Sequence, residues 1–318
     1  MRRLIVAILV FGALAGVAFW LLTEPRRLAA ADLPQHTPDL ANGERMFWAG
    51  GCESCHAPAG AQGDDMLKLA GGPPLVTSFG TFHAPNISPD PQNGIGGWST
   101  LDFVNAMKFG VAPDGTHLYP AFPYTSYQRM RLEDLIDLKA FLDTLPAMAS
   151  PSASHELAFP FTIRRGLGLW QLLYVDGATF SPDPAKSDIV NQGAYLVEGP
   201  AHCGECHTPR NLIGGPDTTR AYAGGPAPEG DGTIPNITPA HLDWSEDDIA
   251  AMLETGFTPE FDSVGGGAQP READGRRPRR DRRLYPPADA GRVIRVSRAP
   301  VRSGRRRHEA RPPPRPSA

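Results

Sequence analysis

The four cysteines of the chain lie in two copies of one pentapeptide, Cys-x-x-Cys-His. Residues 52–56 read Cys-Glu-Ser-Cys-His and residues 203–207 read Cys-Gly-Glu-Cys-His. Two thiols three positions apart reach the two vinyl groups of one porphyrin, and the histidine that follows lies under the iron as proximal ligand. The spacing therefore predicts two covalently attached c-type haems. The predicted thioether residues are Cys52, Cys55, Cys203 and Cys206, and the predicted iron ligands are His56 and His207.

Two other uses of paired cysteines fit part of this pattern. A four-cysteine zinc site also uses C-x-x-C pairs, but zinc needs no histidine after each pair and would have to join pairs about 150 residues apart. A thioredoxin-like redox pair belongs in a strand–helix–strand context, whereas the flanks here are rich in Gly, Pro and His. Haem attachment is the interpretation that uses both whole motifs, and zinc binding or a disulfide is the alternative.

The chain begins with a segment of membrane-spanning length. Arg2 and Arg3 precede an uncharged apolar run over residues 4–22, which as a helix is about 30 Å long. The run is longer than the apolar part of a usual secretory signal, and Trp20 lies near its far end, where interfacial aromatics are enriched. The leading arginines predict a cytoplasmic N-terminus, and hence a single-pass inner-membrane protein with a periplasmic body. The anchor spans residues 1–30; cleavage near the alanines that follow position 28 is the alternative.

The two halves of the chain repeat the same order of elements. After each motif come a Gly-Gly-Pro turn, an Asn-Ile-Ser/Thr-Pro element and a Trp-Ser pair that opens a helical stretch. The interval from this Trp to the glycine that ends the stretch is twelve residues in both copies, from Trp98 to Gly110 and from Trp244 to Gly256. The serines after the two tryptophans are predicted N-caps, and an Asp three residues on completes an acidic first turn. These serines are Ser99 and Ser245.

Further helices are expected before each motif and at the end of the first half. Helices are predicted to run through residues 42–47 and 192–196 into the two motifs. Residues 131–145 carry apolar side chains at helical spacing, stop at Pro146, and are interpreted as core. Strand signals are short and few. The body is therefore predicted to be mainly α.

This organisation resembles class I cytochrome c domains in tandem, and more closely the membrane-anchored multihaem cytochrome c subunits that accept electrons from periplasmic alcohol, gluconate or fructose dehydrogenases. The resemblance covers about residues 38–266 and rests on both haem motifs with their flanks, the Asn-Ile-Ser/Thr-Pro elements and the segment His-Leu-Tyr-Pro-Ala-Phe-Pro-Tyr at 117–124. Such subunits often carry three haems, whereas this chain has two motifs. The resemblance implies a first domain at 38–148 and a second, incomplete one at 187–266.

The resemblance also implies how the irons are held. The carbonyl of Pro73 or Pro226, in the Gly-Gly-Pro turns, would accept the Nδ1 hydrogen bond of the proximal histidine. The distal methionine of the family falls in a Tyr-Pro-Ala-Met-Pro-Tyr loop, where this chain has Phe122, which cannot bind iron. Met130 is the nearest substitute, either as distal ligand or as an apolar core residue. The weaker candidates are Met107 and His117.

The second half offers no evident distal methionine. The offset of 146 residues between the two Trp-Ser pairs places Ala268 opposite Phe122, and no methionine follows Met252. Met252 itself falls inside the predicted helix and is expected to lie in the core. The second haem would then be five-coordinate, hold water or bind a displaced histidine.

Two segments have no counterpart in the repeat. Residues 149–186 have an aromatic centre with the basic pair Arg164 and Arg165, and are interpreted as a strap packed across both domains; a docking surface for a membrane partner or the bilayer interface is the alternative. Residues 271–318 contain sixteen Arg, no Lys and five acidic residues, so this part carries +11 and the rest −15, which together give the net −4. The segment 267–318 is predicted to be disordered if it is genuine, and its abrupt composition favours a frameshift near codons 266–268.

The composition and motifs together predict an electron-transfer protein rather than a catalyst. It would carry electrons from a periplasmic dehydrogenase to quinone or a terminal oxidase, and its acidic body suits a basic partner surface. The alternative is a dihaem oxidoreductase, similar to a thiosulfate dehydrogenase or a peroxidase, with an open distal haem site. Export places the basic tail away from nucleic acid, so no nucleic-acid partner is expected.

Overall fold

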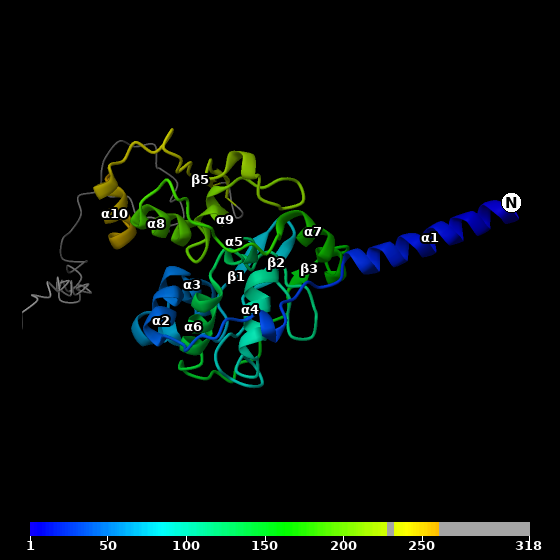
Figure 1. Cartoon of the computed structure of the whole chain (residues 1–318), viewed down its shortest axis with the longest axis horizontal. Helices are drawn as coiled ribbons and strands as arrows, with labels where there is room; N and C mark the ends of the chain where they lie inside the picture. The colour runs from blue at the N-terminus through cyan, green and yellow to red at the C-terminus, as the bar shows by residue number, and fades with distance from the viewer. Residues whose placement is uncertain (228–231, 261–318) are drawn as a thin grey trace, which may run out of the picture. The chain divides into compact units, whose positions relative to one another are not determined.

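The computed structural model describes residues 1–227 and 232–260 of the 318-residue chain, and every structural statement below concerns these residues. Helices dominate them and strands are short, so the mainly α prediction is confirmed (Figure 1). The predicted disordered tail at 267–318 and the proposed frameshift lie outside the described residues.

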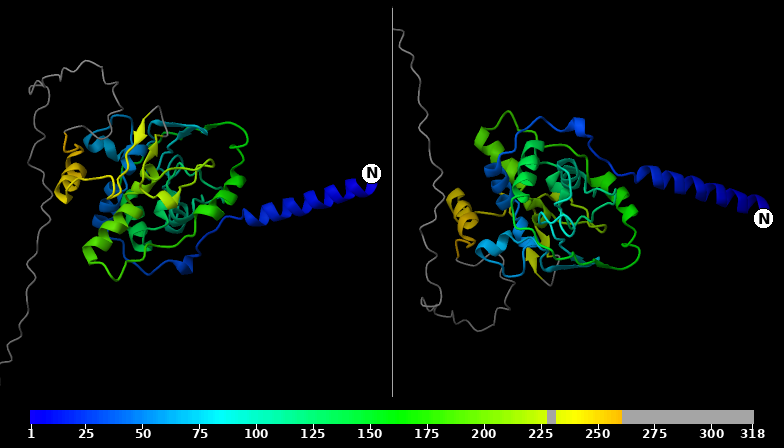
Figure 2. Two further views of the ribbon diagram at one scale, coloured as in Figure 1. Left: turned by 90° about the horizontal axis from the view of Figure 1, so that it is seen from above. Right: turned by 90° about the horizontal axis from the view of Figure 1, so that it is seen from below.

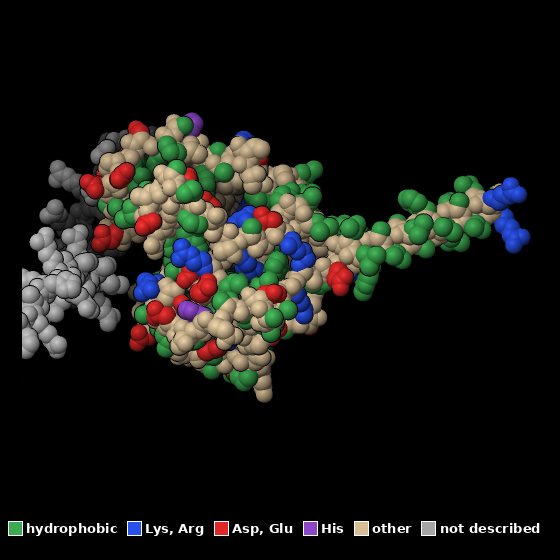
Figure 3. Space-filling view, in the orientation of Figure 1, with side chains coloured by type: hydrophobic (Ala, Val, Ile, Leu, Met, Phe, Trp, Pro, Cys, Tyr) green, Lys and Arg blue, Asp and Glu red, His purple; other side chains and the backbone are tan. Residues whose placement is uncertain are grey.

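The N-terminal helix α1 spans Arg2–Leu22 and buries none of its residues. Figure 3 shows apolar side chains along its whole length and basic side chains at its N-terminal tip. Its length and composition are sufficient to cross a membrane, and a secretory signal meets the same criteria. A short 3-10 turn, Ala30–Asp32, follows it before the first half of the body.

The first half is built around the packing of α2 (Leu40–Ala49) on α6 (Leu132–Leu142), which lie side by side (Figure 1). The approach is close because residue 43 is glycine: a Cβ there would overlap the Asp137 carbonyl. Helix α6 ends three residues before Leu145, which is nevertheless buried. The other elements of this half are α3 (Cys52–His56), a 3-10 turn (Gly63–Leu67), β1 (Pro74–Thr77), β2 (Gly80–His83), α4 (Thr100–Phe109) and α5 (Tyr124–Tyr127).

The second half repeats the order of helices with fewer packing partners. Helix α8 (Asp188–Glu198) leads into α9 (Cys203–His207), and α10 (Glu246–Thr255) follows a short antiparallel pair, β4 (Gly225–Pro226) and β5 (Thr233–Ile234). A 3-10 turn, Thr218–Arg220, lies between α9 and β4. Figure 2 shows α10, in orange, at the margin of this half in both views.

The predicted helix caps of the repeat are confirmed in both halves. Ser99 and Ser245 each accept a hydrogen bond from the backbone N–H three residues on, and the Asp there bonds back to the serine N–H. Gly110 and Gly256 end the two helices in the left-handed conformation, with φ of 61° and 73°. The local signals for these helices are therefore the same.

The strap between the halves contacts both of them. Strand β3 (Glu156–Leu157) adds to the edge of β2, with Thr81 opposite Glu156, so that β1, β2 and β3 form one antiparallel sheet. A 3-10 turn (Arg164–Gly166) then leads into α7 (Leu167–Tyr174). From α7, the Trp170 indole N–H donates to the Ile213 carbonyl in the second half at 3.0 Å.

Candidate haem-attachment sites

The first C-x-x-C-H motif forms a helix of little more than one turn, α3, so that Cys52 and Cys55 lie on one face. The His56 Nδ1–H donates to the carbonyl of Pro85 at 2.8 Å. Because a carbonyl oxygen only accepts, Nδ1 carries the proton, and Nε2 of the neutral ring keeps its lone pair. Burial lowers the pKa of His56, which favours this neutral, metal-binding form.

The second motif repeats this arrangement. The His207 Nδ1–H donates to the carbonyl of Pro235 at 2.9 Å. The prediction that Pro73 or Pro226 supplies these acceptors is therefore wrong. The Gly-Gly-Pro turns contact the histidine main chain instead: the N–H groups of the first glycines donate to the carbonyls of His56 and His207, at 3.0 and 2.7 Å. The proline that precedes each Asn-Ile-Ser/Thr-Pro element holds the ring.

The residues of both motifs fit a covalently held haem. None of the four cysteines forms a disulfide, and the residues that the structure describes contain no cluster of three or more His, Cys, Asp or Glu that suits a metal ion alone, which argues against the zinc alternative. Burial raises the pKa of Cys52 to about 12, and burial also raises the pKa values of Cys203 and Cys206. Cys52 packs against the apolar core cluster of the first half, whose members include Phe47 and Tyr127. Apolar surroundings of this kind suit a porphyrin face.

The candidate distal ligands of the first haem lie in different environments. Met130 is buried in the core cluster of the first half, just before α6, and Met107 lies in the same cluster on α4. Phe122 is half-buried, with its ring 5.5 Å from that of Tyr127. His117 is not available as a ligand, because its Nδ1 lies 2.7 Å from Gln171 Oε1 and its Nε2 lies 2.9 Å from the carbonyl oxygen of Thr23.

In the second half, α10 does not pack as predicted. Met252 is half-buried, so the expectation that it lies in the core is wrong. Helix α10 buries none of its residues, because no helix of the described part covers it as α6 covers α4. Ala268, which corresponds to Phe122, lies outside the described residues.

The second motif is joined to the first half of the body through Glu205, which lies inside the motif. Its Oε1 accepts hydrogen bonds from the hydroxyls of Thr125 and, at 2.7 Å, Ser126 on α5 of the first half. Its Oε2 forms an ion pair with Arg210, and its side chain is only 11% exposed. A carboxylate of the second motif is thus held by α5, the short helix that follows Phe122.

Two aromatic residues complete this junction. Tyr127 is buried, and its ring lies edge-on to that of His202 at 5.5 Å between centroids. Burial raises the pKa of Tyr127 well above its ordinary value, and the negative charge of Glu205 adds to the rise. On α8, the buried Tyr195 hydroxyl donates to Asp134 of α6.

Sequence reasoning missed three residues of these sites. Pro85 and Pro235 were detectable, because each stands directly before Asn-Ile in the same place of the repeat. Glu205 had no such signal, because the first motif has Ser54 at its position. Ser54 donates to the Gly51 carbonyl at 2.6 Å and also lies 3.9 Å from the Cys55 sulfur, both within its own turn.

A mainly helical body with short C-x-x-C-H helices, each with its histidine ring fixed by a proline carbonyl, defines a c-type cytochrome. The chain belongs to the cytochrome c family, whose sequence model matches residues 40–146. It is 52% identical over 266 residues to a "Diheme cytochrome c-type" of Cereibacter sphaeroides, a match that covers 84% of this chain and 90% of the relative.

Other relatives are subunits of dehydrogenases. The chain is 36% identical to the fructose dehydrogenase cytochrome subunit of Gluconobacter japonicus, over 78% of this chain and 50% of the relative. It is 34% identical to the gluconate 2-dehydrogenase cytochrome c subunit of Pantoea cypripedii, over 75% of this chain and 56% of the relative. The chain therefore spans about half the length of these subunits. The family and these relatives support an electron-transfer cytochrome with covalently bound haem c.

Proposed function

We propose that the chain is a membrane-bound dihaem cytochrome c, with its body on the periplasmic side, which carries electrons from a dehydrogenase to quinone or a terminal oxidase. One haem is attached at Cys52 and Cys55 with His56 as proximal ligand. The other haem is attached at Cys203 and Cys206 with His207 as proximal ligand. Met130 is proposed as the distal ligand of the first haem.

The observation that carries this proposal is the repeated histidine geometry. Haem iron, when bound, supplies one-electron redox chemistry. His56 and His207 each present Nε2 because Pro85 and Pro235 bind the opposite nitrogen, and such a bond fixes the ring and raises its basicity. Glu205 joins the second motif to α5, so the two sites are adjacent in one folded body.

A redox titration of the full-length protein tests the haem assignment. We expect two one-electron transitions in the wild-type protein and one in each of the variants C52S/C55S and C203S/C206S. Ser54→Ala, which changes a residue of the first motif without removing a thiol, is the matched control and keeps both transitions. A wild-type protein with a single transition would contradict the dihaem proposal.

The proposed role of Met130 is tested by the sulfur-to-iron charge-transfer band of the oxidised protein. We expect Met130→Leu to abolish the band of the first haem, while Met107→Leu, a matched change in the same core cluster, retains it. If Met130→Leu retains the band, Met130 is a core residue.

Carbon monoxide distinguishes electron transfer from the alternative of a dihaem enzyme. A haem with a protein ligand on both faces does not bind carbon monoxide, whereas an open distal site does. Phe122 at the place of the family's methionine, and the sequence beyond Met252 without any methionine, are the features that favour the alternative. Carbon monoxide binding at either reduced haem, together with turnover of thiosulfate or peroxide, would support it.

The dehydrogenase partner is proposed from the relatives, three kinds of which are named as dehydrogenase cytochrome subunits. Purification of the tagged protein from membranes should recover a dehydrogenase subunit in a fixed ratio. Adding the substrate of that enzyme should then reduce both haems, and quinone should reoxidise them. Recovery of the cytochrome alone under conditions that preserve other membrane complexes would contradict a stable partnership.

A further inference from the structure

Beyond the membrane helix, the strap carries an apolar surface of its own. On α7, Leu169, Leu172 and Leu173 are exposed, and their spacing of i, i+3 and i+4 places them on one helix face. The opposite face is buried, with Trp170 and Gln171 in the body. The loop before α7 adds three more exposed apolar side chains. They are Phe159, which is 80% exposed, Phe161 and Ile163.

The end of α1 is fixed against this surface. Thr23, directly after α1, is fully buried, and its carbonyl oxygen lies 2.9 Å from Nε2 of His117. The Arg165 Nε–H donates to the Thr23 hydroxyl at 2.8 Å, and its Nη2 donates to the Trp20 carbonyl at 2.7 Å. Its guanidinium also lies 4.1 Å from the centroid of the Trp20 ring. The strap is thus held at the level where the apolar helix ends.

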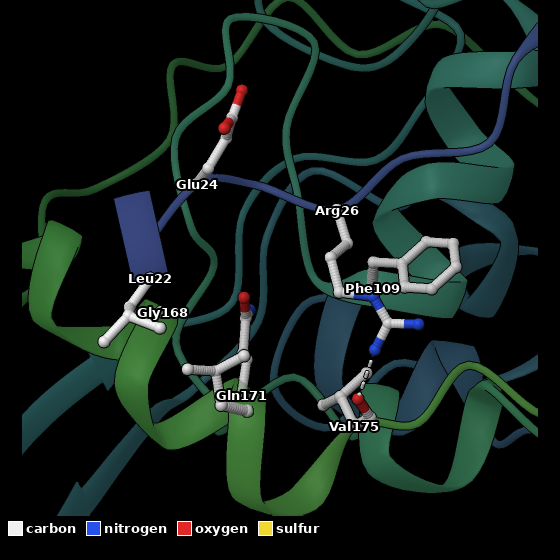
Figure 4. Close-up of a pocket in the computed structure, with 8 residues that line it drawn as sticks. Leu22, Glu24, Arg26, Phe109, Gly168, Gln171 and Val175 are labelled. Atoms are coloured by element: carbon white, nitrogen blue, oxygen red, sulfur yellow. Dashed lines mark hydrogen bonds between the residues drawn. The ribbon is translucent and has the colours of Figure 1, made fainter. Parts of the chain in front are cut away.

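The apolar surface is continuous from α1 onto α7. Leu22, the last residue of α1, and Leu172 of α7 line one small hollow. Figure 4 shows Leu22 and Gly168 at this hollow. The approach requires glycine, because a Cβ on Gly168 would lie 2.7 Å from the Cα of Thr23. Glu24, Arg26 and Gln171 also line this hollow, so charged and polar side chains lie beside the leucines where α1 ends.

Basic side chains border the same region. Arg26 and Arg27 follow α1 and bind backbone carbonyls of the body, at Val175 and Ala112 respectively. Arg164 and Arg165 precede α7. Figure 3 shows basic side chains gathered where α1 meets the body. Exposed leucine and phenylalanine beside arginine suit the boundary between acyl chains and anionic headgroups.

We propose that this surface, Phe159, Phe161, Ile163, Leu169, Leu172 and Leu173, lies in the lipid interface of the bilayer that α1 crosses. The inference rests on the proposed membrane anchoring and deepens it: the cytochrome body is held against the membrane in one orientation instead of swinging on a tether. The occupant is the bilayer because the surface continues an apolar membrane-length helix and is bordered by arginine.

Spin labels on the full-length haem-loaded protein test this inference. Single cysteines replace Leu14 on α1, Leu169 or Leu173 on α7, and Ile189 on α8, all of which are exposed apolar positions. The variants are placed in vesicles of phosphatidylethanolamine and phosphatidylglycerol, with no other protein. Power saturation then compares collisions with oxygen, which concentrates in lipid, and with a water-soluble nickel chelate.

We expect labels at positions 14, 169 and 173 to be oxygen-accessible and the label at 189 to be exposed to the nickel chelate. Ile189 is the control because it is more exposed than the α7 leucines, at 81% against 42% for Leu169 and 67% for Leu173, but lies in the second half. A lipid-exposed label at 14 with water-exposed labels at 169 and 173 would overturn the surface and leave the anchor intact. A water-exposed label at 14 would contradict the anchoring itself. Labels at 169 and 173 shielded from both reagents would show that a second copy of the chain covers α7, and would also overturn the inference.

Discussion

The two halves of the molecule share their local structure and differ in what packs on it. Helices α4 and α10 have the same capping box and the same left-handed glycine end, yet α4 buries seven of its ten residues and α10 buries none. Met107 on α4 is 5% exposed, whereas Leu253, at the corresponding position of α10, is 75% exposed. Short-range sequence signals therefore form the helix, and long-range partners decide whether it belongs to a core.

The asparagine of the Asn-Ile-Ser/Thr-Pro element makes long-range hydrogen bonds in the first half and local ones in the second. Asn86 Nδ2 donates to the carbonyls of Met148 and Ser150, at 2.6 and 2.8 Å, and so binds the segment that follows α6. Asn236 accepts hydrogen bonds only from its own turn, at Thr238, among the residues that the structure describes. In the first half, α6 and the segment that follows it thus cover the core. The corresponding positions of the second half lie beyond residue 260, outside the described residues.

The largest expected contrast is between two apolar truncations. Met107→Ala should lower the free energy of unfolding by about 2–5 kcal/mol, because it leaves a cavity in the packed core. Leu253→Ala at the matching position should change it by less than about 0.5 kcal/mol. Chemical unfolding followed by circular dichroism measures both. Equal losses would show that residues outside the described ranges cover α10.

A second contrast concerns the two Gly-Gly-Pro turns, each of which packs beside a C-x-x-C-H motif. A Cβ on Gly72 would overlap the Cys55 carbonyl, whereas a Cβ on Gly225 would lie 3.6 Å from the nearest atom, Cα of Pro209. Gly72→Ala should therefore cost about 1–3 kcal/mol and reduce the yield of the first haem, and Gly225→Ala should do neither. Haem content per chain and thermal unfolding measure these effects. A loss of haem in Gly225→Ala would contradict the expected difference between the two turns.

The junction gives a third, smaller effect. Glu205→Ala removes two hydroxyl partners and an ion pair of low exposure, and should destabilise the contact between the halves by about 1–2 kcal/mol. Ser54→Ala, at the matching position of the first motif, loses only bonds within its own turn, to Gly51 and Cys55, and is the control. Amide exchange at Tyr127 should quicken in Glu205→Ala. Unchanged exchange would show that Glu205 does not hold the halves together.

The smallest effect is a pH dependence from Lys108, whose counterpart on α10 is the exposed Glu254. Burial, and then the charge of Arg129, lowers the pKa of Lys108 from 10.5 to about 8. Between these pH values the unfolded chain holds a proton that the folded chain has released, so the free energy of unfolding should rise with pH. Lys108→Met should remove this rise, and the exposed control Lys186→Met should retain it. A rise that persists in Lys108→Met would assign it to another group.

Much of this structure follows from the sequence because its signals are local. The C-x-x-C-H helices, the serine caps and the glycine ends depend on residues within four positions of one another. The Pro85 and Pro235 acceptors lie about 30 residues from their histidines and were misplaced to the nearer Gly-Gly-Pro turns. The contacts of His117 with Thr23 and Gln171 join three distant segments, and no periodicity indicates them. The role of a residue that acts through such long-range contacts cannot be predicted from the sequence and is seen only in the folded structure.

The central claim is that both C-x-x-C-H motifs carry a haem. Tryptic digestion of the mature protein should release residues 46–68 and 187–210 as two peptides, each with one complete motif. Mass spectrometry is expected to find each peptide with one covalent haem and with neither thiol free. A peptide recovered with free thiols or an internal disulfide, from protein whose other motif is loaded, would contradict the claim.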